Sequence, residues 1–389
     1  MTTNRTADAS PARHEAIGLA RLADMLRAEA ANGLYWGGVP EEESRLHAIR
    51  EHAAALFALV DHRPYEEIRA IFATDSDLRT PIPGTEFRID CGDGTRVVHR
   101  RRFRSDTLGH RLEATATALG TAVPEEPIAI ADTDLGFLPC PHTYLLVYEF
   151  ATDLDADAVE KLLEPADPDL DGDLPTLPPA ASAVVPERGP LRVSPAAKEI
   201  LDDVAALAKE SLATVTSTYS IERQHRIAAH CERAVEAELD YPRIDCGDLA
   251  AYGVPTGADA AIFDDEGRIL VIRRTDTGQW AVPGGGTEVG EPVALAAIRE
   301  ALEETGLDVE LTELAWAFDK RDTNLGDSRM PMIMSFTARM LDPAQPIRLA
   351  ELEASDHRWL TRDEASQADL FKGHELRIPV AFTKRFGEG

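Results

Sequence analysis

Apolar residues near the start of the chain recur every three to four positions, as they do on the buried face of a helix. This spacing predicts two helices between residues 15 and 62, separated by Asn32-Gly33 and by the turn-rich stretch from Trp36 to Pro40. A short third helix is predicted over residues 66–72, so that residues 1–75 form a helical N-terminal region. The two series of apolar positions are Ile17, Leu19, Leu22 and Leu26, and Leu46, Ile49, Ala53, Leu56 and Leu59.

From about residue 85 the pattern changes to short apolar runs bounded by turn residues, which is typical of strands and predicts an α+β domain over residues 85–165. A stretch rich in proline and aspartate follows, and we interpret residues 166–194 as an extended linker that buries no core. Helices resume at Ser194-Pro195, a good helix start, and predict a helical segment over residues 195–240. The apolar runs lie at 96–99, 127–130 and 143–148.

Three short motifs occur twice along the chain and in the same order, which favours duplication of a unit made of helices and a sheet. The distances between the motifs differ in the two halves. The pairs are Arg45-x-His47-x-Ile49-x-x-His52 with Arg223-x-His225-x-Ile227-x-x-His230, Arg88–Asp93 with Arg243–Asp248, and Gly94-x-x-Val97-Val98-x-Arg100-Arg101 with Gly267-x-x-Leu270-Val271-x-Arg273-Arg274.

Composition narrows the class of protein. The 389 residues are 44% hydrophobic and 28% charged, as expected for a globular protein with two or more folded units. The sequence has neither a long uncharged apolar stretch nor the apolar centre of a secretory signal, so we expect a cytoplasmic protein with no membrane partner. The cysteines contain no CxxC pair and are expected to be free thiols; they are Cys91, Cys140, Cys231 and Cys246.

The net charge of −29 argues against nucleic-acid partners, because the protein would repel a phosphate backbone. A small phosphate-bearing ligand would need a divalent cation and local arginines. The densest basic run is His99–Arg104. We expect its arginines to offset neighbouring acids at a strand end, with phosphate binding as the alternative.

Glycines and charged residues in the last third of the chain follow a fixed spacing. Gly284-Gly285-Gly286 predicts a loop whose backbone can approach a ligand closely. Residues 292–305 predict a helix that Gly306 ends. On it Glu300, Glu303 and Glu304 stand at i, i+3 and i+4, on one face. The full motif is Gly285-x5-Glu291-x7-Arg299-Glu300-x2-Glu303-Glu304-x-Gly306-Leu307.

Three like charges on one helix face repel one another unless a cation lies between them. Carboxylate oxygens are the ligands that Mg²⁺ or Mn²⁺ prefers beside phosphates, where the ion neutralises phosphoryl charge and lowers the pKa of an attacking water. Arg299, rotated away from these carboxylates, is better placed to bridge back to Glu291 and brace the loop. An exposed acidic helix would not need the accompanying glycines and arginine.

This motif resembles the Nudix box, with every charged and glycine position met. Ala301 alone departs, standing where the family usually has a larger aliphatic residue. The flanking stretches Trp280–Gly286, Arg268–Arg274 and Trp359-Leu360 also resemble the family. The resemblance covers about residues 250–389 and implies a catalytic Nudix domain, an α/β/α sandwich built on a mixed sheet. We therefore expect an α/β protein in which helical segments and a second, α+β domain precede this one.

The resemblance also implies roles. Glu300, Glu303 and Glu304 would bind Mg²⁺ or Mn²⁺, with the Gly285 carbonyl as a further ligand, and Glu291 and Arg299 would support the site structurally. The general base comes from the box or from a late loop in this family. The catalytic candidates are therefore Glu300, Glu303 and Glu304 of the box and Glu353 of the late loop. Glu351 and Asp356 lie in the same loop as Glu353, and solvated loop acids are the alternative for these three. Arg273, Arg274, Trp280 and Phe318 are expected at the substrate, with core packing as the alternative for Trp280, Phe318 and Phe371.

Residues 17–62 resemble the N-terminal helices of hydrolases of X-linked nucleoside diphosphates, through Asn32–Tyr35 and Glu41–Glu43. Phe318–Arg321 and Met330–Met332 resemble the same group. This implies a homodimer that cleaves a small nucleotide diphosphate, of the nucleotide-sugar or CDP-alcohol type, into a nucleoside monophosphate and phosphorylated X. Asp322 stands near the position at which many ADP-ribose hydrolases carry a proline. The alternatives are a housecleaning (deoxy)nucleoside triphosphate pyrophosphatase and a non-catalytic nucleotide-sugar sensor, which would not need an intact box.

If the duplication holds, residues 85–165 form a degenerate Nudix-like fold; an unrelated small α+β domain is the alternative. Aligning Gly120 with Gly306 places Ala114, Thr117 and Ala118 at the positions of the three glutamates. No metal could be held there, so a structural, regulatory or substrate-gating role is expected.

Overall fold

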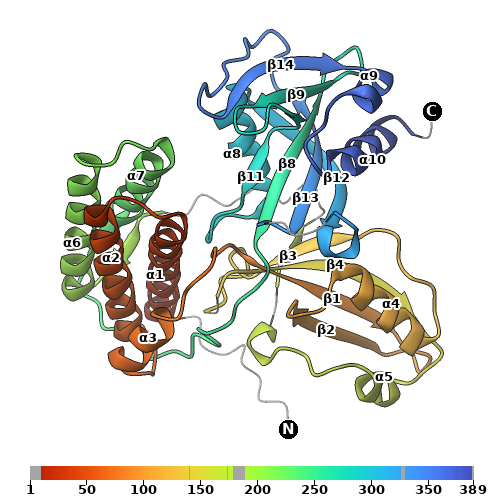
Figure 1. Ribbon diagram of the computed structural model, residues 1–389. Coiled ribbons are helices and arrows are strands. Elements are labelled where there is room, and N and C mark those ends of the chain that lie inside the picture. Colours follow the sequence, from red (N-terminus) through yellow and green to blue (C-terminus); the bar gives the residue numbers. More distant parts are fainter. Residues whose placement is uncertain (1–9, 140, 173, 178–188, 326–328, 388–389) are drawn as a thin grey trace.

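The computed structural model describes residues 10–139, 141–172, 174–177, 189–325 and 329–387 (Figure 1). A helical bundle lies beside two sheet domains, one built from the orange and yellow strands and one from the cyan and blue strands. Within the described ranges, no helix is both long and apolar enough to cross a membrane.

The helical bundle combines two helical hairpins that lie far apart in the sequence. The hairpins share one apolar core, in which Leu26, Leu56, Leu201 and Ile227 are all fully buried. Each hairpin alone would leave one apolar face in water, so the bundle needs both. Its elements are α1 (Pro11–Trp36), α2 (Pro40–Val60), α3 (Tyr65–Phe72), α6 (Pro195–Leu212) and α7 (Thr218–Glu232), with the short parallel strands β6 (Leu191–Val193) and β7 (Ala234–Glu236) alongside.

The predicted helix break at Asn32-Gly33 is wrong, because α1 continues to Trp36. A Cβ on Gly33 would lie 2.6 Å from Leu46 Cδ1, so the glycine lets α1 approach α2 closely. The Asn32 side chain donates to the carbonyl of Arg79 at 2.9 Å and accepts from its amide at 2.6 Å. A residue pair that is typical of a turn is used here for packing. The third helix lies where it was predicted.

The first sheet has the strand order β2-β1-β4-β3-β5. Its central pair, β1 and β4, is parallel, and the pairs β1–β2 and β3–β4 are antiparallel. The helix α4 packs its buried residues, among them Leu112 and Ala116, against the apolar face that carries Phe87 and Tyr148. The elements are β1 (Ile82–Asp90), β2 (Arg96–Arg102), α4 (Leu108–Leu119), β3 (Ala129–Asp132), β4 (Thr143–Ala151), α5 (Ala156–Leu162), η1 (Pro168–Leu170) and β5 (Thr176–Leu177).

The second sheet is mixed and lies between helices, which confirms the predicted α/β/α sandwich. Alternate residues of its central strand β8 face opposite sides: Ala260 packs with α8, and Phe263 with α10. The main strand order is β10-β9-β8-β13-β12, with β11 on β8 and β14 on β9. The elements are β8 (Thr256–Phe263), β9 (Ile269–Arg274), β10 (Trp280–Ala281), β11 (Gly284–Gly286), α8 (Val293–Thr305), β12 (Val309–Asp319), η3 (Lys320–Asp322), β13 (Met332–Met340), β14 (Ala354–Leu360), α9 (Arg362–Gln367) and α10 (His374–Phe386).

The two sheets share one pattern of neighbours and directions. The order β2-β1-β4-β3 corresponds to β9-β8-β13-β12, and in each the outer pairs are antiparallel and the central pair is parallel. The helices α4 and α8 both end at a left-handed glycine, Gly120 and Gly306. Each first hairpin also turns at a left-handed glycine, Gly94 or Gly267.

The repeated motifs do not all fall on equivalent elements. Arg45 and Arg223 are each the sixth residue of their helices, α2 and α7. The match of Arg88–Asp93 with Arg243–Asp248 is wrong as a structural equivalence, because Arg88 lies within β1. The second copy lies in the connection to β8, where Ile244 forms a bridge to Asp61 at the end of α2.

Residues 167–172 and 174–177 pack on the first sheet, so the prediction of a linker that buries no core is wrong for this part. Leu170 is fully buried, and β5 pairs with β3. Asp167 accepts from the Arg102 amide at 2.6 Å, and Asp169 accepts from Arg102 Nη1 at 2.8 Å. Residues 178–188 of the predicted linker lie outside the described residues.

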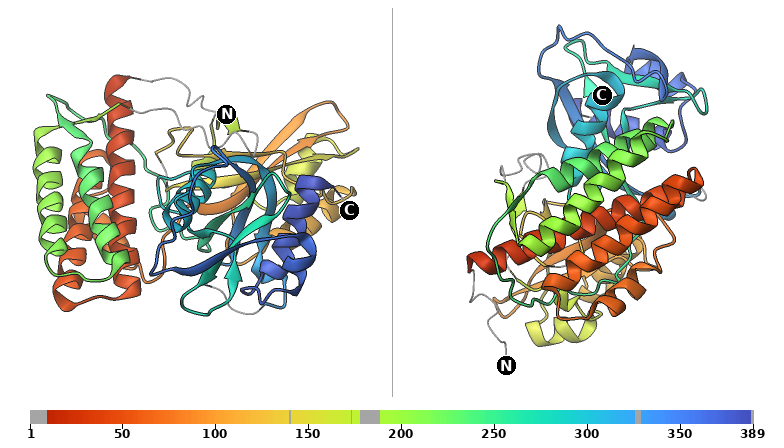
Figure 2. Two further views of the ribbon diagram at one scale, coloured as in Figure 1. Left: turned by 90° about the horizontal axis from the view of Figure 1, so that it is seen from above. Right: turned by 90° about the vertical axis from the view of Figure 1, so that its left-hand side faces the viewer.

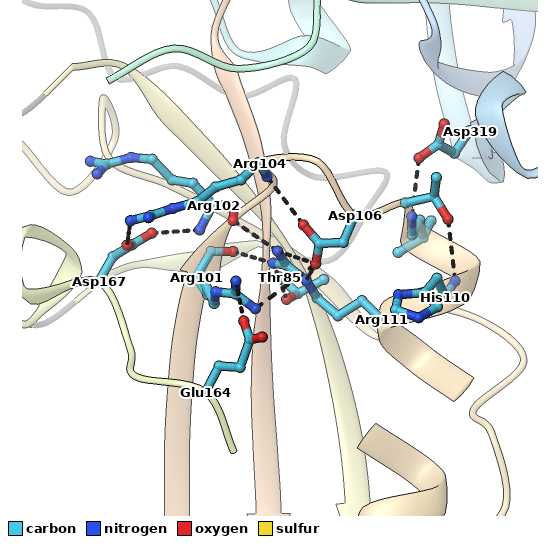
Figure 3. A network of polar contacts seen from close by, with 12 residues as sticks. Thr85, Arg101, Arg102, Arg104, Asp106, His110, Arg111, Glu164, Asp167 and Asp319 are labelled. Carbon is cyan, nitrogen blue, oxygen red and sulfur yellow. Dashed lines mark hydrogen bonds and ion pairs between the residues drawn. The ribbon is translucent and has the colours of Figure 1, made fainter. Parts of the chain in front are cut away.

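The arginines of the basic run pair with acids of this chain (Figure 3). Arg101 pairs with Glu164, and Arg104 Nη2 lies 3.5 Å from Asp167 Oδ1. Arg100 pairs with the buried Glu86 at 2.7 Å. These contacts confirm the expectation that the arginines offset neighbouring acids, and they leave phosphate binding without support.

The start of α4 joins the first sheet domain to the second. The Leu108 amide donates to Asp319 Oδ2 at 3.0 Å, and Asp319 is labelled in Figure 3. The Gly109 amide donates to Asp322 Oδ2 at 2.8 Å. Asp322, noted above for replacing a proline, thus holds the two domains together.

Three of the cysteines, Cys91, Cys231 and Cys246, are buried free thiols as expected. Cys140 lies outside the described residues.

Candidate active site

The glycine loop lies directly on the central strand of the second sheet. β11 pairs antiparallel with β8, so that Gly284 is opposite Asp259. A Cβ on Gly284 would lie 2.4 Å from the Asp259 Cβ, and one on Gly285 would lie 2.6 Å from the Glu300 carboxylate. A side chain at Gly284 would therefore clash with the backbone of a strand, and one at Gly285 would displace the carboxylate of the acidic helix.

The acidic helix α8 begins after Pro292 and ends at Gly306, whose φ of 71° is left-handed. It matches the predicted helix to within one residue. Ala301, which departs from the box, is fully buried beneath the acidic face. Its carbonyl accepts from Thr305 Oγ1 at 2.5 Å in the last turn.

The glutamates of α8 differ in their surroundings. Burial raises the pKa of Glu300 to about 7, and Glu303 and Glu291 add to the effect against the opposing influence of Arg299. Glu304 is buried and accepts from the Gly284 amide at 2.8 Å. Burial and the charges of Glu300 and Glu353 raise its pKa well above the ordinary value. Glu303 is the exposed member of the set.

Arg299 holds the loop against the helix. Its guanidinium bonds both oxygens of Glu291, at 2.9 and 3.0 Å, and the carbonyl of Gly286 at 2.9 Å. The inference that Arg299 is rotated away from the acidic face is wrong, since Nη1 also donates to Glu300 at 2.8 Å and to Glu303 at 2.9 Å. The arginine can make all of these contacts because its planar group carries five donors.

The donor set of this face fits a hard divalent cation. Two glutamates with raised pKa values and a third at the rim form a cluster that a cation would stabilise. No three acidic, histidine or cysteine side chains among the described residues already converge tightly enough to hold an ion. Glu300 and Glu303 are instead bonded to Arg299.

The three late-loop acids are not equally placed. Glu353 is near enough to Glu304 to raise its pKa. The Glu353 carbonyl accepts from the Thr275 amide at 2.9 Å, and the Ala350 amide donates to the carbonyl of Glu304 at 3.1 Å. This loop is therefore anchored to the end of α8. Glu351 and Asp356 are exposed. Asp356 lies in β14, opposite Arg273 of the neighbouring strand β9.

The predicted substrate-binding residues do not gather in one place. Trp280 and Phe318 are buried, with 8% and 1% of their surfaces exposed, and Arg358 covers the Trp280 ring. Arg273 is exposed and donates to the Gly278 carbonyl. Arg274 stacks on Phe371 at 4.5 Å. Its positive charge opposes the rise in the pKa of Glu304 that burial causes. Arg274 is thus the member of this set that the structure places near the acidic face.

The helical bundle contributes residues that sequence reasoning missed. Arg226 of α7 pairs with Glu288, beside the glycine loop, at 2.9 Å and with Glu29 of α1 at 2.7 Å. Tyr219 and Glu222, on the same face of α7, approach Glu353 and Glu303. The sequence does place Tyr219, Glu222 and Arg226 at i, i+3 and i+7, on one polar face of a helix. That spacing does not say which part of the protein the face lies against.

A family model described as the NUDIX domain matches residues 254–379. The MutT-like protein of Streptomyces ambofaciens is 35% identical over 106 residues, which are 27% of this chain and 63% of that protein. The putative 8-oxo-dGTP diphosphatase of Bacillus subtilis (strain 168) is 39% identical over 56 residues, 14% of this chain and 38% of that protein. This chain therefore spans less than two thirds of the length of either relative.

A further relative is matched over most of its length. The nucleoside triphosphatase NudI of Escherichia coli O17:K52:H18 (strain UMN026 / ExPEC) is 30% identical over 119 residues, which are 28% of this chain and 84% of NudI. Among solved structures, a UDP-X diphosphatase is 21% identical with a TM-score of 0.40, and the match covers 49% of this chain and 93% of that one.

Proposed function

Since this chain belongs to the Nudix family through its C-terminal domain, we propose that it hydrolyses the P–O–P link of a nucleoside diphosphate joined to another group, X. The reaction would require Mg²⁺ or Mn²⁺, and its products would be a nucleoside monophosphate and phosphorylated X. The observation that carries this proposal is a pair of glutamates, the half-buried Glu300 and the buried Glu304, set against the Gly284-Gly285 backbone, with Glu300 braced by Arg299.

The residues divide the work as follows. Glu300, Glu303 and Glu304, with the Gly285 carbonyl, would hold a divalent cation, which when bound neutralises phosphoryl charge and lowers the pKa of water. Glu353 would accept a proton from the attacking water. The oxygen of that water forms a bond to one phosphorus while the bridging P–O bond breaks and the other phosphate leaves. Arg299 and Glu291 would keep the loop and α8 in register, and Arg274 would approach the phosphates.

The identity of X is part of the proposal. We favour a nucleotide sugar or a CDP-alcohol, on the resemblance of the N-terminal helices. Nucleoside triphosphates are the second candidate, because NudI matches over most of its length and is named for that substrate. A nucleotide-sugar sensor has no comparable support from the acidic face. Arg273, Trp280 and Phe318 would act on the substrate only after rearrangement, since two of them are buried and Arg273 donates to Gly278.

We also propose that residues 85–165 are a Nudix-like fold without its box and that their role is structural. The matching strand orders support this, and α4 carries Ala114, Thr117 and Ala118 on the face where α8 carries glutamates. A cytoplasmic homodimer is part of the same proposal. Its interface would avoid the helix faces already buried within one chain, and light scattering of the purified protein would test it.

The direct test is hydrolysis of a panel containing nucleotide sugars, CDP-alcohols and nucleoside triphosphates, with Mg²⁺ and after chelation. Glu303→Gln should lower kcat by about 100-fold or more, since one stabilising group at a transition state is worth that much. The matched control is Glu266→Gln, an exposed glutamate in the β8–β9 turn. No hydrolysis of any compound by the parent, or equal rates for the two variants, would reject the proposal.

A further inference from the structure

A buried histidine of the first sheet domain binds the box loop, by which we mean residues 287–291. His142 stands just before β4, and it is buried beside Asp132, the last residue of β3. Its Nδ1 accepts from the Gly290 amide at 2.8 Å, across 148 positions of sequence. Its Nε2 lies 3.1 and 3.2 Å from the two carboxylate oxygens of Asp132. One ring therefore connects a carboxylate of the first sheet domain to the backbone of the second.

These hydrogen bonds determine where the ring proton lies. A backbone amide can only donate, so Nδ1 of His142 must present a lone pair to Gly290. The proton of the neutral ring then lies on Nε2, which donates to Asp132. Asp132 is held in turn, because its Oδ1 accepts from the amides of Asp134 at 2.6 Å and Leu135 at 3.3 Å. The carboxylate thus selects the form of His142 that can bind the box loop.

The box loop leads from Gly290 to the acidic face. Glu291 follows directly, and Arg299 donates to its two oxygens at 2.9 and 3.0 Å and also to two glutamates of the acidic face. The loop is tightly packed at this point, since Met25 Sδ of α1 would lie 2.8 Å from a Cβ on Gly290. A shift of Gly290 would therefore reach the acidic face through Glu291 and Arg299.

The helix α1 holds the same corner of the first sheet domain. In the left view of Figure 2, α1 is the helix of the bundle that lies nearest the sheet domains. Its Arg21 forms an ion pair with Asp134 and donates to the Thr133 carbonyl at 3.4 Å. Thr133 and Asp134 directly follow Asp132. The aspartate that orients His142 therefore stands at the start of a segment that the bundle anchors.

The contact has a counterpart in the opposite direction. Asp319, the last residue of β12, accepts from the amide of Leu108, the first residue of α4, at 3.0 Å. In the pattern that the two sheets share, β12 corresponds to β3. Each sheet domain thus binds the backbone at or just before the other's helix through the aspartate that ends the equivalent strand. Toward the box, His142 stands between that aspartate and the amide.

We propose that His142, oriented by Asp132, is a positioning residue of the active site, which fixes the box loop by accepting from the Gly290 amide. The inference rests on the proposed function, because it assigns the box loop to the reaction. It gives a definite task to the first sheet domain, which lies outside residues 254–379. An amide that has lost its acceptor no longer fixes its loop, and a small error in the position of a catalytic group is costly in rate.

Two amide side chains separate the two bonds of the ring. In His142→Asn the side-chain oxygen can take the place of Nδ1 and accept from Gly290, but nothing reaches Asp132. In His142→Gln the longer amide can reach Asp132, but no atom takes the place of Nδ1. His142→Gln should lower kcat about 10-fold, and His142→Asn should stay within about threefold of the parent. The matched control, His110→Gln, changes an exposed histidine of the same domain and should keep the kcat of the parent.

The order of the two variants decides the inference. If the buried ring served only the stability of the first sheet domain, both variants would lose activity alike, or His142→Gln would keep more because it keeps the bond to Asp132. Equal kcat values for the two variants, or a lower value for His142→Asn, would therefore overturn the inference.

Hydrogen exchange supplies a readout that needs neither metal nor turnover. The Gly290 amide should exchange about 10-fold faster in His142→Gln than in the parent or in His142→Asn, because its acceptor is gone. The Ile82 amide, which donates to the His142 carbonyl at 2.8 Å, should stay unchanged and reports that the sheet is intact. Unchanged exchange at Gly290 would reject the contact itself.

The two readouts also separate this inference from the proposed function. If the parent hydrolyses nothing in the panel, the proposed function fails, and the role of His142 in the reaction fails with it. Faster exchange at Gly290 in that inactive protein would leave His142 as a support of the box loop alone.

Discussion

Replacing Gly285 by alanine would place a methyl group against the carboxylate of Glu300. The added Cβ would lie 2.6 Å from Glu300 Cδ and from both of its oxygens, whereas ordinary contact begins at 3.4 Å, so the carboxylate has to withdraw by about 0.8 Å. Arg299 Nη1 opposes this movement, because it holds Glu300 at 2.8 Å. Gly285 is not among the glycines with positive φ, so alanine is not strained there by its backbone conformation.

A displacement of this size bears mainly on catalysis. Misplacing a group of the site by about 1 Å can cost about 100-fold in rate, so kcat should fall by about 30- to 100-fold, or about 2–3 kcal/mol of activation free energy. The free energy of unfolding should fall by only about 1–2 kcal/mol, since the clash meets the flexible end of a side chain.

The assay compares initial rates with Mg²⁺, on whichever compound the parent hydrolyses, and thermal unfolding of the same samples. Gly286→Ala is the control, because the nearest atom to its added Cβ is Met330 Sδ at 3.5 Å. It should resemble the parent in both measurements. If Gly285→Ala keeps its rate within about threefold of this control, the reasoning from the contact to Glu300 is refuted.

Three further outcomes are expected. Gly284→Ala should lower the free energy of unfolding by about 1–3 kcal/mol, measured in urea, because its Cβ would lie 2.6 Å from the Ala258 carbonyl; a parent-like midpoint would contradict this. Burial favours a raised pKa for Asp61, but the hydrogen bonds and charge of Arg63, with a hydrogen bond from the Cys246 side chain, lower it from 3.8 to about 2. The stabilising contribution of Asp61 is therefore complete above its ordinary pKa and is lost as the pH falls from 3.8 to about 2. The difference in free energy of unfolding between the parent and Asp61→Asn should shrink over this pH range, and a constant difference would contradict the assignment. Burial raises the pKa of the Cys231 and Cys246 thiols, so peptide mass spectrometry after iodoacetamide should find both unmodified until guanidinium is added.

The sequence predicts the acidic helix well because all of its information is local. The spacing of Glu300, Glu303 and Glu304 fixes their common face, and Gly306 marks the helix end. For Arg299, the predicted contact with Glu291 is confirmed, but the predicted separation from the acidic face is wrong. A side chain with five donors can bond both groups at once. Periodicity does not specify how a long side chain divides its hydrogen bonds.

The parts that depend on distant contacts could not be predicted. Arg226 meets Glu29 across 197 positions of sequence, and nothing near either residue specifies the other. The same holds for Gly33, whose role in α1 depends on Leu46 of the facing helix. Residues 167–177 have the composition of a linker, yet Leu170 has a sheet to pack on. In each case tertiary context overrides a local preference.

The helical bundle is assembled from hairpins between which a complete sheet domain is inserted. During synthesis, α1 and α2 leave the ribosome long before α6 and α7 exist, and the apolar face that they share with the later hairpin must wait through the translation of residues 61–194. At elongation rates of about 5–20 residues per second this interval lasts roughly 7–30 s, far longer than helices need to form. The inserted domain can fold in the meantime. Messages truncated before residue 195 would therefore yield a chain with an exposed apolar helix face, a natural target for chaperones and proteases.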